Sequence, residues 1–377
     1  MKRSNGGKKV RVAHLTTNLR ANGITNVVLS YCGNIPANAI GSTVITASPV
    51  DDIAVERCRE LGVRLIVLPD KTKDPAHFFP ALMKEVSGKK YDIVHVHGNS
   101  ATITAELMIC LLRGVKVRIA HAHSVTCDHM KAHKLLWPLF CHTYTKGFAC
   151  STAAGKWLFR DRPFTVLPNA FDTRRFIFDP EKREEVRTRS GLQDRFVIGA
   201  VSRLNVSKNY PYLLQIFEAA AKTRPDLALL IAGDGPEREH ILSMIAEHPF
   251  KDRIVYYGNA AHPEDVFSAV DAFVLPTQFE GLGIVFLEAQ ISGLPCLASD
   301  AVPRDVVIDP DAISFLPLTK DPTPWADAII KMKPNPAREA FYEAHLAGIS
   351  RFEITDAAKK LADVYQKLAA ASGRKHK

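Results

Sequence analysis

Several features that mark special classes of protein are missing from this 377-residue chain. Its seven cysteines include no Cys-x-x-Cys pair and leave an odd number, which argues against a disulfide framework or a zinc motif built on cysteines. No run of about 18 apolar residues occurs, and the basic start "MKRSNGGKKVRVAHL" lacks the apolar stretch of a signal peptide. We therefore expect a reduced, cytoplasmic protein that does not span a membrane.

Recognisable nucleic-acid-binding patterns are also missing. The formal net charge is +9, which would suit nucleic acid, an anionic membrane surface or a substrate that carries phosphates. No zinc-finger, RNP or helix-turn-helix pattern is present, and the aromatic residues, at 8%, are not interleaved with the basic ones. We expect no nucleic-acid partner, and the charge then indicates a membrane surface or a phosphate-bearing ligand.

Short runs rich in Val and Ile alternate with amphipathic stretches along most of the chain. This alternation predicts parallel sheets covered by helices on both faces, in two successive series of strands. The first series comprises "KVRVAHL", "STVITAS", "VRLIVLP", "YDIVHVHG" and "VKVRIAHAHS", and the second comprises "RFVIGAVSR", "LALLIAGD", "RIVYYGN", "DAFVLPT" and "PCLASD". The fold class is therefore α/β, with two doubly wound, Rossmann-like domains.

The stretch between the two series is highly charged and contains prolines. "LPNAFDTRRFIFDPEKREEVRTRSGLQD" shows no apolar residue at every second position, so we interpret it as a linker. The apolar residues from Ile354 to Leu368 follow helical spacing and predict a last helix before a short basic tail. We expect domains at 1–172 and 173–352, followed by a C-terminal segment at 353–377.

Ligands of open α/β sheets bind beyond the carboxyl ends of the strands, where helix N-termini favour anions. Glu280 follows the strand "DAFVLP", and the turn Gly281-Leu282-Gly283 then presents backbone amides that suit a phosphate. Glu288 falls about one turn into the next helix among apolar residues, where a carboxylate is costly unless it is hydrogen-bonded. The plain alternatives are a loop charge for Glu280 and a solvated helix face for Glu288.

The segment "FEGLGIVFLEAQISGLPCLASD" resembles the E-x7-E segment of the family 4 glycosyltransferases, which have the two-domain GT-B fold. The resemblance extends over residues 10–300 and the last helix. It is carried in order by "NGITNVVLSY", "VHVHG", "RIAHAHS", "ACSTAAGKWLF", "LPNAFD", "GAVSRLNVSKNYPYLLQIF" and "IAGDGPERE". It implies an N-terminal acceptor-binding domain, a C-terminal domain that binds a nucleotide sugar, a cleft between them and a final helix that returns to the first domain.

The resemblance also assigns roles to the residues after the second series of strands. It implies that Glu288 binds the ribose hydroxyls and that Glu280 contacts the transferred sugar, because a carboxylate accepts two hydrogen bonds from a diol. Arg203 and Lys208 of "SRLNVSKN" would grip the diphosphate, whose negative charge grows as the glycosidic bond breaks. Without this context, two basic residues on one loop are equally explained as solvated charges.

In the first domain the resemblance points to a histidine and a glycine. His121 and His123 of "RIAHAHS" end a strand; we expect them to point to opposite faces, and the family's Thr-x-His pattern selects His123 as the residue that binds the donor sugar. A structural role is the alternative for a histidine at this place. Asn22-Gly23 replaces the family's Gly-Gly in a loop that approaches the donor phosphates or the acceptor. The catalytic set is then His123, Glu280, Arg203 and Lys208, and Gly23 joins the donor-binding residues.

Four further residues are interpreted as structural. Gly233 and Gly235 of "AGDGPERE" are interpreted as turn-forming glycines, and Asn169 and Asp172 of "LPNAFD" as capping residues of the linker. No Asp-x-Asp motif follows a strand, and GT-B enzymes generally need no divalent ion. We therefore expect no metal and no cofactor besides the substrate.

The sequence thus predicts a retaining glycosyltransferase that moves a hexosyl unit from a UDP-sugar to an acceptor hydroxyl. "ACSTAAGKWLF" and "RIAHAHS" are most similar to exopolysaccharide and capsule enzymes of bacteria, whose acceptors are often polyprenyl-diphosphate-linked sugars. The alternatives are a UDP-N-acetylglucosamine 2-epimerase and an inactive nucleotide-sugar-binding scaffold protein. An epimerase would lack the E-x7-E context, and a scaffold would release no sugar from the donor.

A last segment, 131–148, combines basic and apolar residues in "KAHKLLWPLFCHTYTKGF". Leu136, Leu139 and Phe140 have helical spacing and would pack on the first sheet in one interpretation. In the other, Lys131, Lys134 and Trp137 lie at an anionic bilayer, where basic residues and an aromatic ring favour weak binding. The second interpretation predicts peripheral attachment to the inner face of the plasma membrane.

Overall fold

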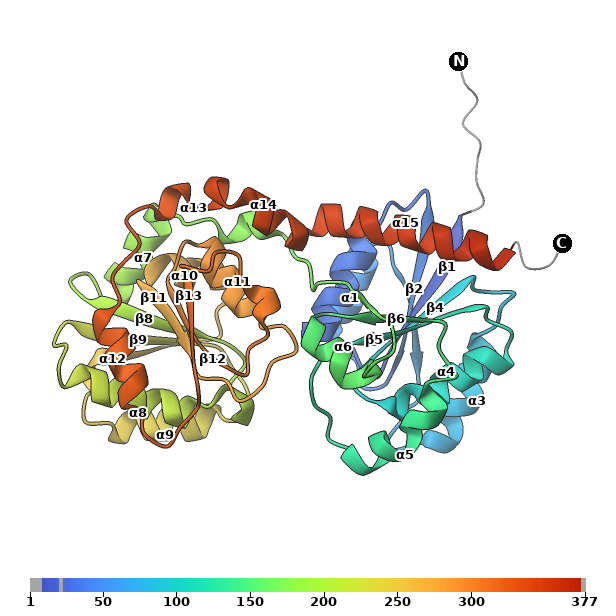
Figure 1. Cartoon of the computed structure of the whole chain (residues 1–377), viewed down its shortest axis with the longest axis horizontal. Coiled ribbons are helices and arrows are strands. Elements are labelled where there is room, and N and C mark those ends of the chain that lie inside the picture. The colour runs from blue at the N-terminus through green and yellow to red at the C-terminus, as the bar shows by residue number, and fades with distance from the viewer. Residues whose placement is uncertain (1–8, 20–22, 374–377) are drawn as a thin grey trace, which may run out of the picture. The chain divides into compact units, whose positions relative to one another are not determined.

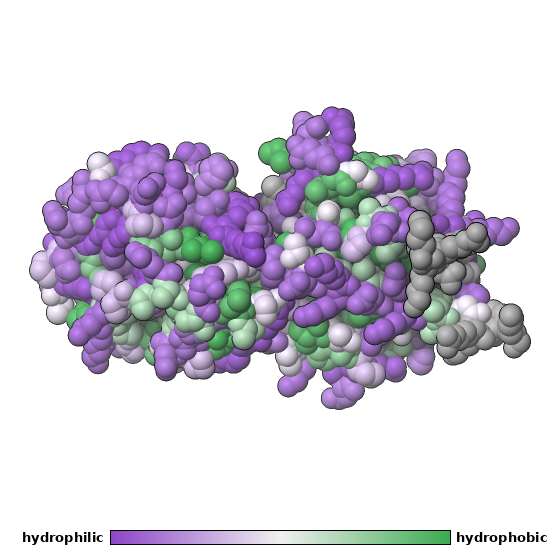
Figure 2. All heavy atoms as spheres, turned by 90° about the horizontal axis from the view of Figure 1, so that it is seen from above, coloured by the Kyte–Doolittle hydropathy of each residue, from purple (hydrophilic) through white to green (hydrophobic). Residues whose placement is uncertain are grey.

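The structure is a computed structural model that describes residues 9–19 and 23–373. The chain forms two compact units, one of Met1–Asp172 with Arg351–Lys377 and the other of Thr173–Ser350. Each unit is a parallel sheet covered by helices, so the predicted pair of doubly wound domains is confirmed (Figure 1). The face drawn in Figure 2 is mostly hydrophilic, with separate hydrophobic patches.

The first unit contains a 7-stranded sheet in which every pair of neighbours is parallel. The strands, in spatial order, are β3 (Arg64–Leu68), β2 (Ile40–Ala47), β1 (Val10–Thr16), β4 (Ile93–Gly98), β5 (Val117–Ala122), β6 (Lys146–Ala149) and β7 (Thr165–Val166). The order reverses between β1 and β4, which makes the carboxyl ends of these two strands the usual place for a ligand. All residues of β4 and β5 are buried, as expected for central parallel strands.

Helices of the first unit form two groups (Figure 1). The elements are α1 (Gly23–Asn34), α2 (Asp52–Glu60), α3 (Pro75–Glu85), η1 (Ala101–Ile103), α4 (Thr104–Leu112), α5 (Met130–Phe140), α6 (Thr152–Phe159) and α15 (Ile354–Gly373). Helix α1 contacts both α2 and α15, and helix α4 contacts both α3 and α5. The predicted return of the last helix to the first domain is confirmed, since α15 packs on α1, β1 and β5.

The second unit contains a 6-stranded parallel sheet. Its strands, in spatial order, are β10 (Ile254–Gly258), β9 (Leu227–Ala232), β8 (Phe196–Val201), β11 (Ala272–Leu275), β12 (Cys296–Ser299) and β13 (Ile313–Leu316). Its helical elements are η2 (Thr173–Phe176), α7 (Pro180–Ser190), η3 (Val206–Lys208), α8 (Tyr210–Ala221), α9 (Arg238–Glu247), η4 (Lys251–Arg253), α10 (Pro263–Ala269), α11 (Ile284–Ile291), η5 (Arg304–Val306), α12 (Thr323–Lys331), α13 (Arg338–Ala344) and α14 (Leu346–Ile349). The short η6 (Ser350–Phe352) spans the boundary between the units.

The interpretation of residues 167–194 as a linker is wrong for most of that stretch, which forms η2 and α7 of the second unit. Asp179 caps α7 by accepting from two backbone amides, and Gly191 ends it in the left-handed conformation. The helix buries a basic residue instead of an apolar stripe: Arg187 is 4% exposed and pairs with the buried Asp271 at 3.2 Å. Hydrophobic periodicity therefore could not reveal it.

Candidate functional site

The strand order of the second sheet reverses between β8 and β11. Ligands of doubly wound sheets bind at such a reversal, beyond the carboxyl ends of the strands. Arg203 and Lys208 follow β8, and Glu280 follows β11, so three of the predicted residues are carried by the two loops at this point. Arg203 is exposed, whereas Lys208 ends the short helix η3.

Hydrogen bonds hold these two loops together. The carbonyl oxygen of Ser207 accepts from the backbone N–H of Gln278 at 2.7 Å and from the hydroxyl of Thr277 at 2.9 Å. Next to this junction the ammonium group of Lys208 forms a hydrogen-bonded ion pair with Glu280. Their side chains are only 15% and 12% exposed, so the pair is largely shielded from water. The structure thus brings Lys208 and Glu280 together, as a shared site requires.

Glu288 lies in the first turns of α11, directly after the glycine turn. Gly283 begins this helix with a φ of +88°, a conformation that a residue with a side chain rarely adopts, and the buried Leu282 (2% exposed) anchors the turn. Burial raises the pKa of the Glu288 carboxyl to about 7, an effect that nearby Arg175 opposes and nearby Glu264 strengthens. A carboxylate so poorly hydrated can be stabilised by a ligand that donates hydrogen bonds.

Arg175 and Glu264 belong to the surroundings of Glu288, and the sequence did not identify them. They form an ion pair with 2.9 Å between Nη2 and Oε1, and Arg175 is carried by η2, within the stretch interpreted as linker. No local sequence pattern links these residues, because residues 175, 264 and 288 lie on three separate elements and meet only in the folded chain.

The turn after β9 packs against the loop that carries Arg203. Gly233 has a φ of +143°, and a Cβ added to it would come within 1.8 Å of the carbonyl oxygen of Ser202. The backbone N–H of Leu204 donates to the carbonyl of Asp234 at 2.9 Å. Gly233 is therefore required by close approach of two backbones, which agrees with its interpretation as a turn-forming residue.

In the first unit, the expectation that His121 and His123 point to opposite faces is wrong. Their ring centroids are 4.0 Å apart, because side chains two residues apart along a strand share a face. His121 lies within β5 at 1% exposure, and His123 follows the strand at 7%. His123 therefore lies nearer the carboxyl edge of the sheet, where a ligand would reach it. Burial lowers its pKa to about 4, so the imidazole is neutral at pH 7.

Asn169 is a neighbour of His123 and not a capping residue of a linker, which corrects the expectation. It is 8% exposed, and its side chain partly offsets the lowering of the His123 pKa. Gly23 is the first residue of α1, with open space where a side chain would begin. Asn22, its predicted partner in the flexible loop, lies outside the described residues.

The predicted membrane segment contains α5, in which Trp137 is partly buried. Trp137 donates its indole N–H to the carbonyl of Leu158 at 2.9 Å, and the Arg160 guanidinium covers its ring at 3.8 Å. The indole N–H is therefore engaged within the first unit, and anchoring of Trp137 at a bilayer stays a prediction. The exposed large apolar side chains of α5 are Leu135 (80% exposed), Leu139 (47%) and Met130 (37%).

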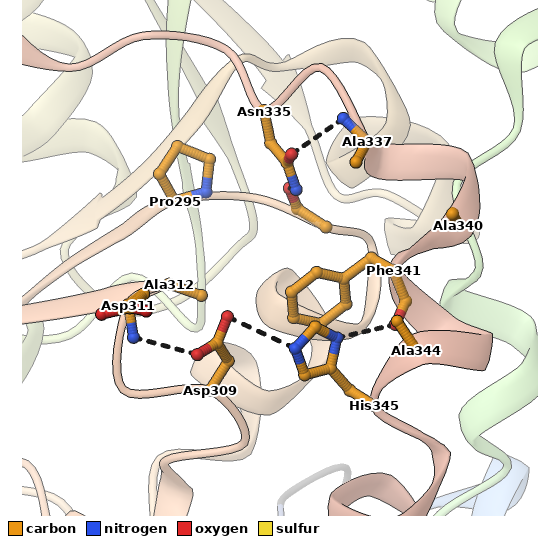
Figure 3. A pocket seen from close by; sticks show the side chains of 11 residues that line it. Pro295, Asp309, Asp311, Ala312, Asn335, Ala337, Ala340, Phe341, Ala344 and His345 are labelled. Carbon is orange, nitrogen blue, oxygen red and sulfur yellow. Dashed lines mark hydrogen bonds and ion pairs between the residues drawn. The ribbon is translucent and has the colours of Figure 1, made fainter.

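A separate pocket of about 300 Å³ lies at the opposite edge of the second sheet. Pro295 and Ala312 line it just before β12 and β13 begin. Figure 3 shows His345 between Asp309 and Phe341, with 3.4 Å from its Nε2 to the Asp309 carboxylate and its ring stacked on Phe341. Because Glu280 and Glu288 follow the carboxyl end of β11, this pocket is not part of their site.

Comparison with known families gives two matches that together span most of the chain. Residues 5–175 match the family model described as Glycosyltransferase Family 4. Residues 182–345 match the model described as Glycosyl transferases group 1. The two matches correspond to the two halves of the fold.

Individual relatives cover nearly the whole length. EpsF of Bacillus subtilis (strain 168), named as a glycosyltransferase, is 26% identical over 85% of this chain and 87% of its own. The UDP-Gal:alpha-D-GlcNAc-diphosphoundecaprenol alpha-1,3-galactosyltransferase of Escherichia coli is 25% identical over 86% of this chain and 88% of its own. The crystal structure of Anabaena HepE in complex with UDP and glucose has a TM-score of 0.78 at 16% identity, covering 95% of this chain and 100% of that one.

Within residues 9–19 and 23–373, none of the helices has the length and apolar character needed to cross a bilayer.

Proposed function

Because the chain is a glycosyltransferase that joins a family 4 domain to a group 1 domain, we propose that it is a retaining enzyme acting on a UDP-sugar. It transfers the hexosyl unit to a hydroxyl of a lipid-linked saccharide in the assembly of a bacterial polysaccharide. The observation that carries the proposal is the shielded Lys208–Glu280 pair at the reversal point of the second sheet, with Glu288 one helix turn beyond the same loop.

The two loops have the charges that a sugar diphosphate requires. An ammonium group has three N–H donors, so Lys208 can keep its bond to Glu280 and still donate to a phosphate oxygen. Arg203, on the same loop, adds a guanidinium that suits phosphate oxygens. Together they offset the negative charge that develops on the leaving diphosphate, and this lowers the barrier to transfer.

Glu288 and Glu280 supply acceptors for hydroxyl groups. Glu288 accepts from the two ribose hydroxyls, which restores the hydrogen bonds that burial removes from its carboxylate. Glu280, held by Lys208, accepts from hydroxyls of the transferred sugar. The leaving phosphate takes the proton of the acceptor hydroxyl on the same face of the sugar, and neutral His123 accepts from or donates to the sugar as a hydrogen-bonding group.

The printed names of relatives support the choice of donor and acceptor. The Escherichia coli galactosyltransferase is named for a UDP-linked donor and a diphosphoundecaprenol-linked acceptor, and the HepE structure is a complex with UDP and glucose. The test incubates the full chain with UDP-glucose, UDP-galactose, their N-acetyl forms or GDP-mannose, together with a polyprenyl-diphosphate-linked saccharide. Mass spectrometry should find one added hexose with a UDP-sugar. Transfer from GDP-mannose alone would overturn the choice of nucleotide. If the protein neither transfers nor hydrolyses the sugar of any donor, the proposal that it is a catalyst is wrong.

We place the enzyme in the cytoplasm, weakly attached to the inner face of the plasma membrane. The support comes from α5, where exposed Leu135 and Leu139 share the helix surface with Lys131 and Lys134. Basic residues near anionic lipid contribute about 1 kcal/mol each, and two leucines add apolar contact. Such attachment is reversible and weakens with salt.

Flotation with anionic liposomes at low and high salt tests this attachment. Wild type should float at low salt, and Lys131→Glu/Lys134→Glu and Leu135→Ser/Leu139→Ser should each reduce flotation. A matched control is Lys84→Glu/Lys90→Glu, which changes two basic residues of the same unit outside α5. If wild type stays at the bottom at low salt, or if the α5 variants float equally well, α5 does not bind the membrane.

A further inference from the structure

Five buried histidines gather at the first sheet, on the neighbouring strands β1, β4 and β5 and directly after β5. They are His14 (1% exposed), His95 (1%), His97 (5%), His121 (1%) and His123 (7%). Centroids of neighbouring rings are 4.0 to 5.5 Å apart. Sugar transfer as proposed above uses only His123, so the other four rings need a separate explanation.

Two hydrogen-bonded chains connect these rings. In one chain, His97 Nε2 lies 3.2 Å from His14 Nδ1, and His97 Nδ1 lies 2.9 Å from His123 Nε2. In the other, His95 Nε2 lies 3.0 Å from His121 Nδ1, and His95 Nδ1 lies 2.7 Å from the hydroxyl of Tyr365. Within the described part of the chain, the ring nitrogens left without a partner are His14 Nε2, His121 Nε2 and His123 Nδ1.

The rings are neutral at pH 7. Burial lowers the pKa of His14 and of His123 to about 4, and burial together with the neighbouring rings lowers the pKa of the other three well below the usual range. A neutral imidazole carries one N–H and one lone pair. It is the form that binds metal ions, because no proton has to be removed first.

We propose that His97, His121 and His123 form a binding site for one first-row transition-metal ion of the zinc type. One ring nitrogen of each lies within 4.8 Å of those of the other two. A tetrahedral zinc ion, with Zn–N distances of about 2.0–2.1 Å, separates its ligand nitrogens by roughly 3.3 Å. Rotation of the side chains over about 1 Å therefore closes the set. We assign His97 Nδ1, His121 Nε2 and His123 Nε2 as the donor atoms, because the first and third already face each other at 2.9 Å and His121 Nε2 has no partner among the described residues.

Two of the three ligand rings already have a partner for the other nitrogen: His97 Nε2 lies 3.2 Å from His14 Nδ1, and His121 Nδ1 lies 3.0 Å from His95 Nε2. With an ion bound, these two nitrogens carry the ring protons and donate to His14 and His95, while the side chain of Asn169 is the neighbour of His123. Metal-binding histidines usually have such an outer partner, which fixes the tautomer and the ring orientation. The ion takes the place of the proton shared between His97 and His123. The ring that carried this proton moves it to its other nitrogen. All three rings therefore stay neutral, and no proton is released.

A second set of three, His14, His95 and His97, also has nitrogens within 4.8 Å of one another. Both nitrogens of His95 are engaged, one by Tyr365 and one by His121, so an ion there would have to break a contact of His95 with the core, whereas in the chosen set the ion replaces only the bond between two of its own ligands, His97 and His123. His121 instead offers an unpartnered Nε2. The chosen set also contains His97 and His123, the two most exposed rings of the five, at the edge where an ion would enter.

The ligands select the class of ion. Imidazole nitrogens suit Zn²⁺, Cu²⁺, Ni²⁺ and Co²⁺, whereas Mg²⁺ and Ca²⁺ prefer oxygen. Three neutral ligands leave a fourth position and the full charge of the ion, so water or an anion completes the shell. The site does not depend on the proposed transfer reaction, but an ion on His123 Nε2 would remove that atom from sugar binding.

The test titrates the metal-free full chain with Zn²⁺ by calorimetry and with Co²⁺ by visible absorption. Wild type should bind one ion per chain and give the intense visible bands of tetrahedral Co²⁺. His97→Gln and His121→Gln should each weaken binding at least about tenfold. His133→Gln, which alters a buried histidine of the same unit outside the cluster, should bind as wild type. Equal binding by all variants, or binding lost only in His14→Gln, would overturn the assignment.

A measurement on wild type alone avoids dependence on how the variants fold. X-ray absorption of the 1:1 zinc complex should show nitrogen neighbours with the outer-shell scattering of about three imidazoles. A sulfur neighbour, a shell of oxygen alone or no bound zinc would overturn the site. None of these readouts uses transfer activity, so failure of the metal site and failure of the proposed function are distinguishable.

Discussion

Replacing Glu288 with glutamine should stabilise the protein and weaken nucleotide binding at the same time. Burial moves the pKa of Glu288 from 4.5 to about 7, so the folded protein holds this proton more tightly than the unfolded chain does. The contribution of this tighter proton binding to the free energy of unfolding is fully present below about pH 4.5 and is lost as the pH rises through 7. Above pH 7 the ionised carboxylate therefore costs up to about 3 kcal/mol.

Glutamine has nearly the same shape and never ionises. Glu288→Gln should therefore raise the free energy of unfolding by about 1 to 3 kcal/mol at pH 8, and the gain should shrink as the pH falls toward 5. Thermal melting of the ligand-free chain at several pH values measures this. Glu239→Gln, at an 84% exposed side chain on α9, is the control and should change little.

The same variant should bind UDP more weakly, because an amide offers one acceptor to the ribose diol and no charge. If UDP binds only wild type with an ionised Glu288, the affinity of wild type for UDP should rise from pH 6 to pH 8. UDP itself also titrates in this range, and the change in affinity of Glu288→Gln measures that effect. After this correction, the rise in wild type should be about tenfold. Calorimetric titrations give both slopes. A variant that melts no higher than wild type at pH 8 and binds UDP equally well would refute both the desolvation and the ribose contact.

Four further predictions concern the neighbouring residues. Lys208→Ala and Arg203→Ala should each cost about 2 to 5 kcal/mol of transition-state stabilisation, seen as a fall in turnover of at least about tenfold. The control Lys222→Ala, on an exposed helix face, should keep its turnover. Full activity of both Lys208→Ala and Arg203→Ala would show that the diphosphate does not bind to this loop. Glu280→Gln should lower turnover with UDP affinity unchanged, and a loss of UDP affinity instead would reassign it. EDTA should leave transfer largely intact, so a strict need for manganese would contradict the cationic site. Gly233→Ala should lower the melting temperature by several degrees, because its methyl group meets the Ser202 carbonyl; an unchanged melting curve would contradict this close approach.

The sheets were predictable because their physical cause is local. Runs such as "YDIVHVHG" and "LALLIAGD" are apolar over the length of a central strand, and they became β4 and β9. Helix α15 was predictable from the spacing of Ile354, Leu361 and Tyr365, all of them buried. Strand β7, with two exposed residues, offers no such pattern, and the four-residue strands β6 and β13 were likewise not predicted.

The candidate site was only partly predictable. The loop residues Lys208 and Glu280 could be paired through a family motif, but the motif contains nothing about Arg175 beside Glu288 or Asn169 beside His123. Those contacts join residues far apart in the sequence, and their energy depends on burial that only the folded chain creates. The error over His121 and His123 had a simpler origin, because strand periodicity places residues two apart on the same face.

Helix α15 also has a consequence for the order in which the protein is made. Tyr365, fully buried, bonds to His95 in the centre of the first sheet, and Phe171 bonds through its backbone to Phe352 and Ile354. Residues 354–373 are synthesised after the whole second unit, long after β1 to β7 have emerged. The first domain to be translated therefore cannot complete its core before the second domain has been synthesised, and during that interval the surfaces of α1 and β1 that α15 later covers are open to chaperones.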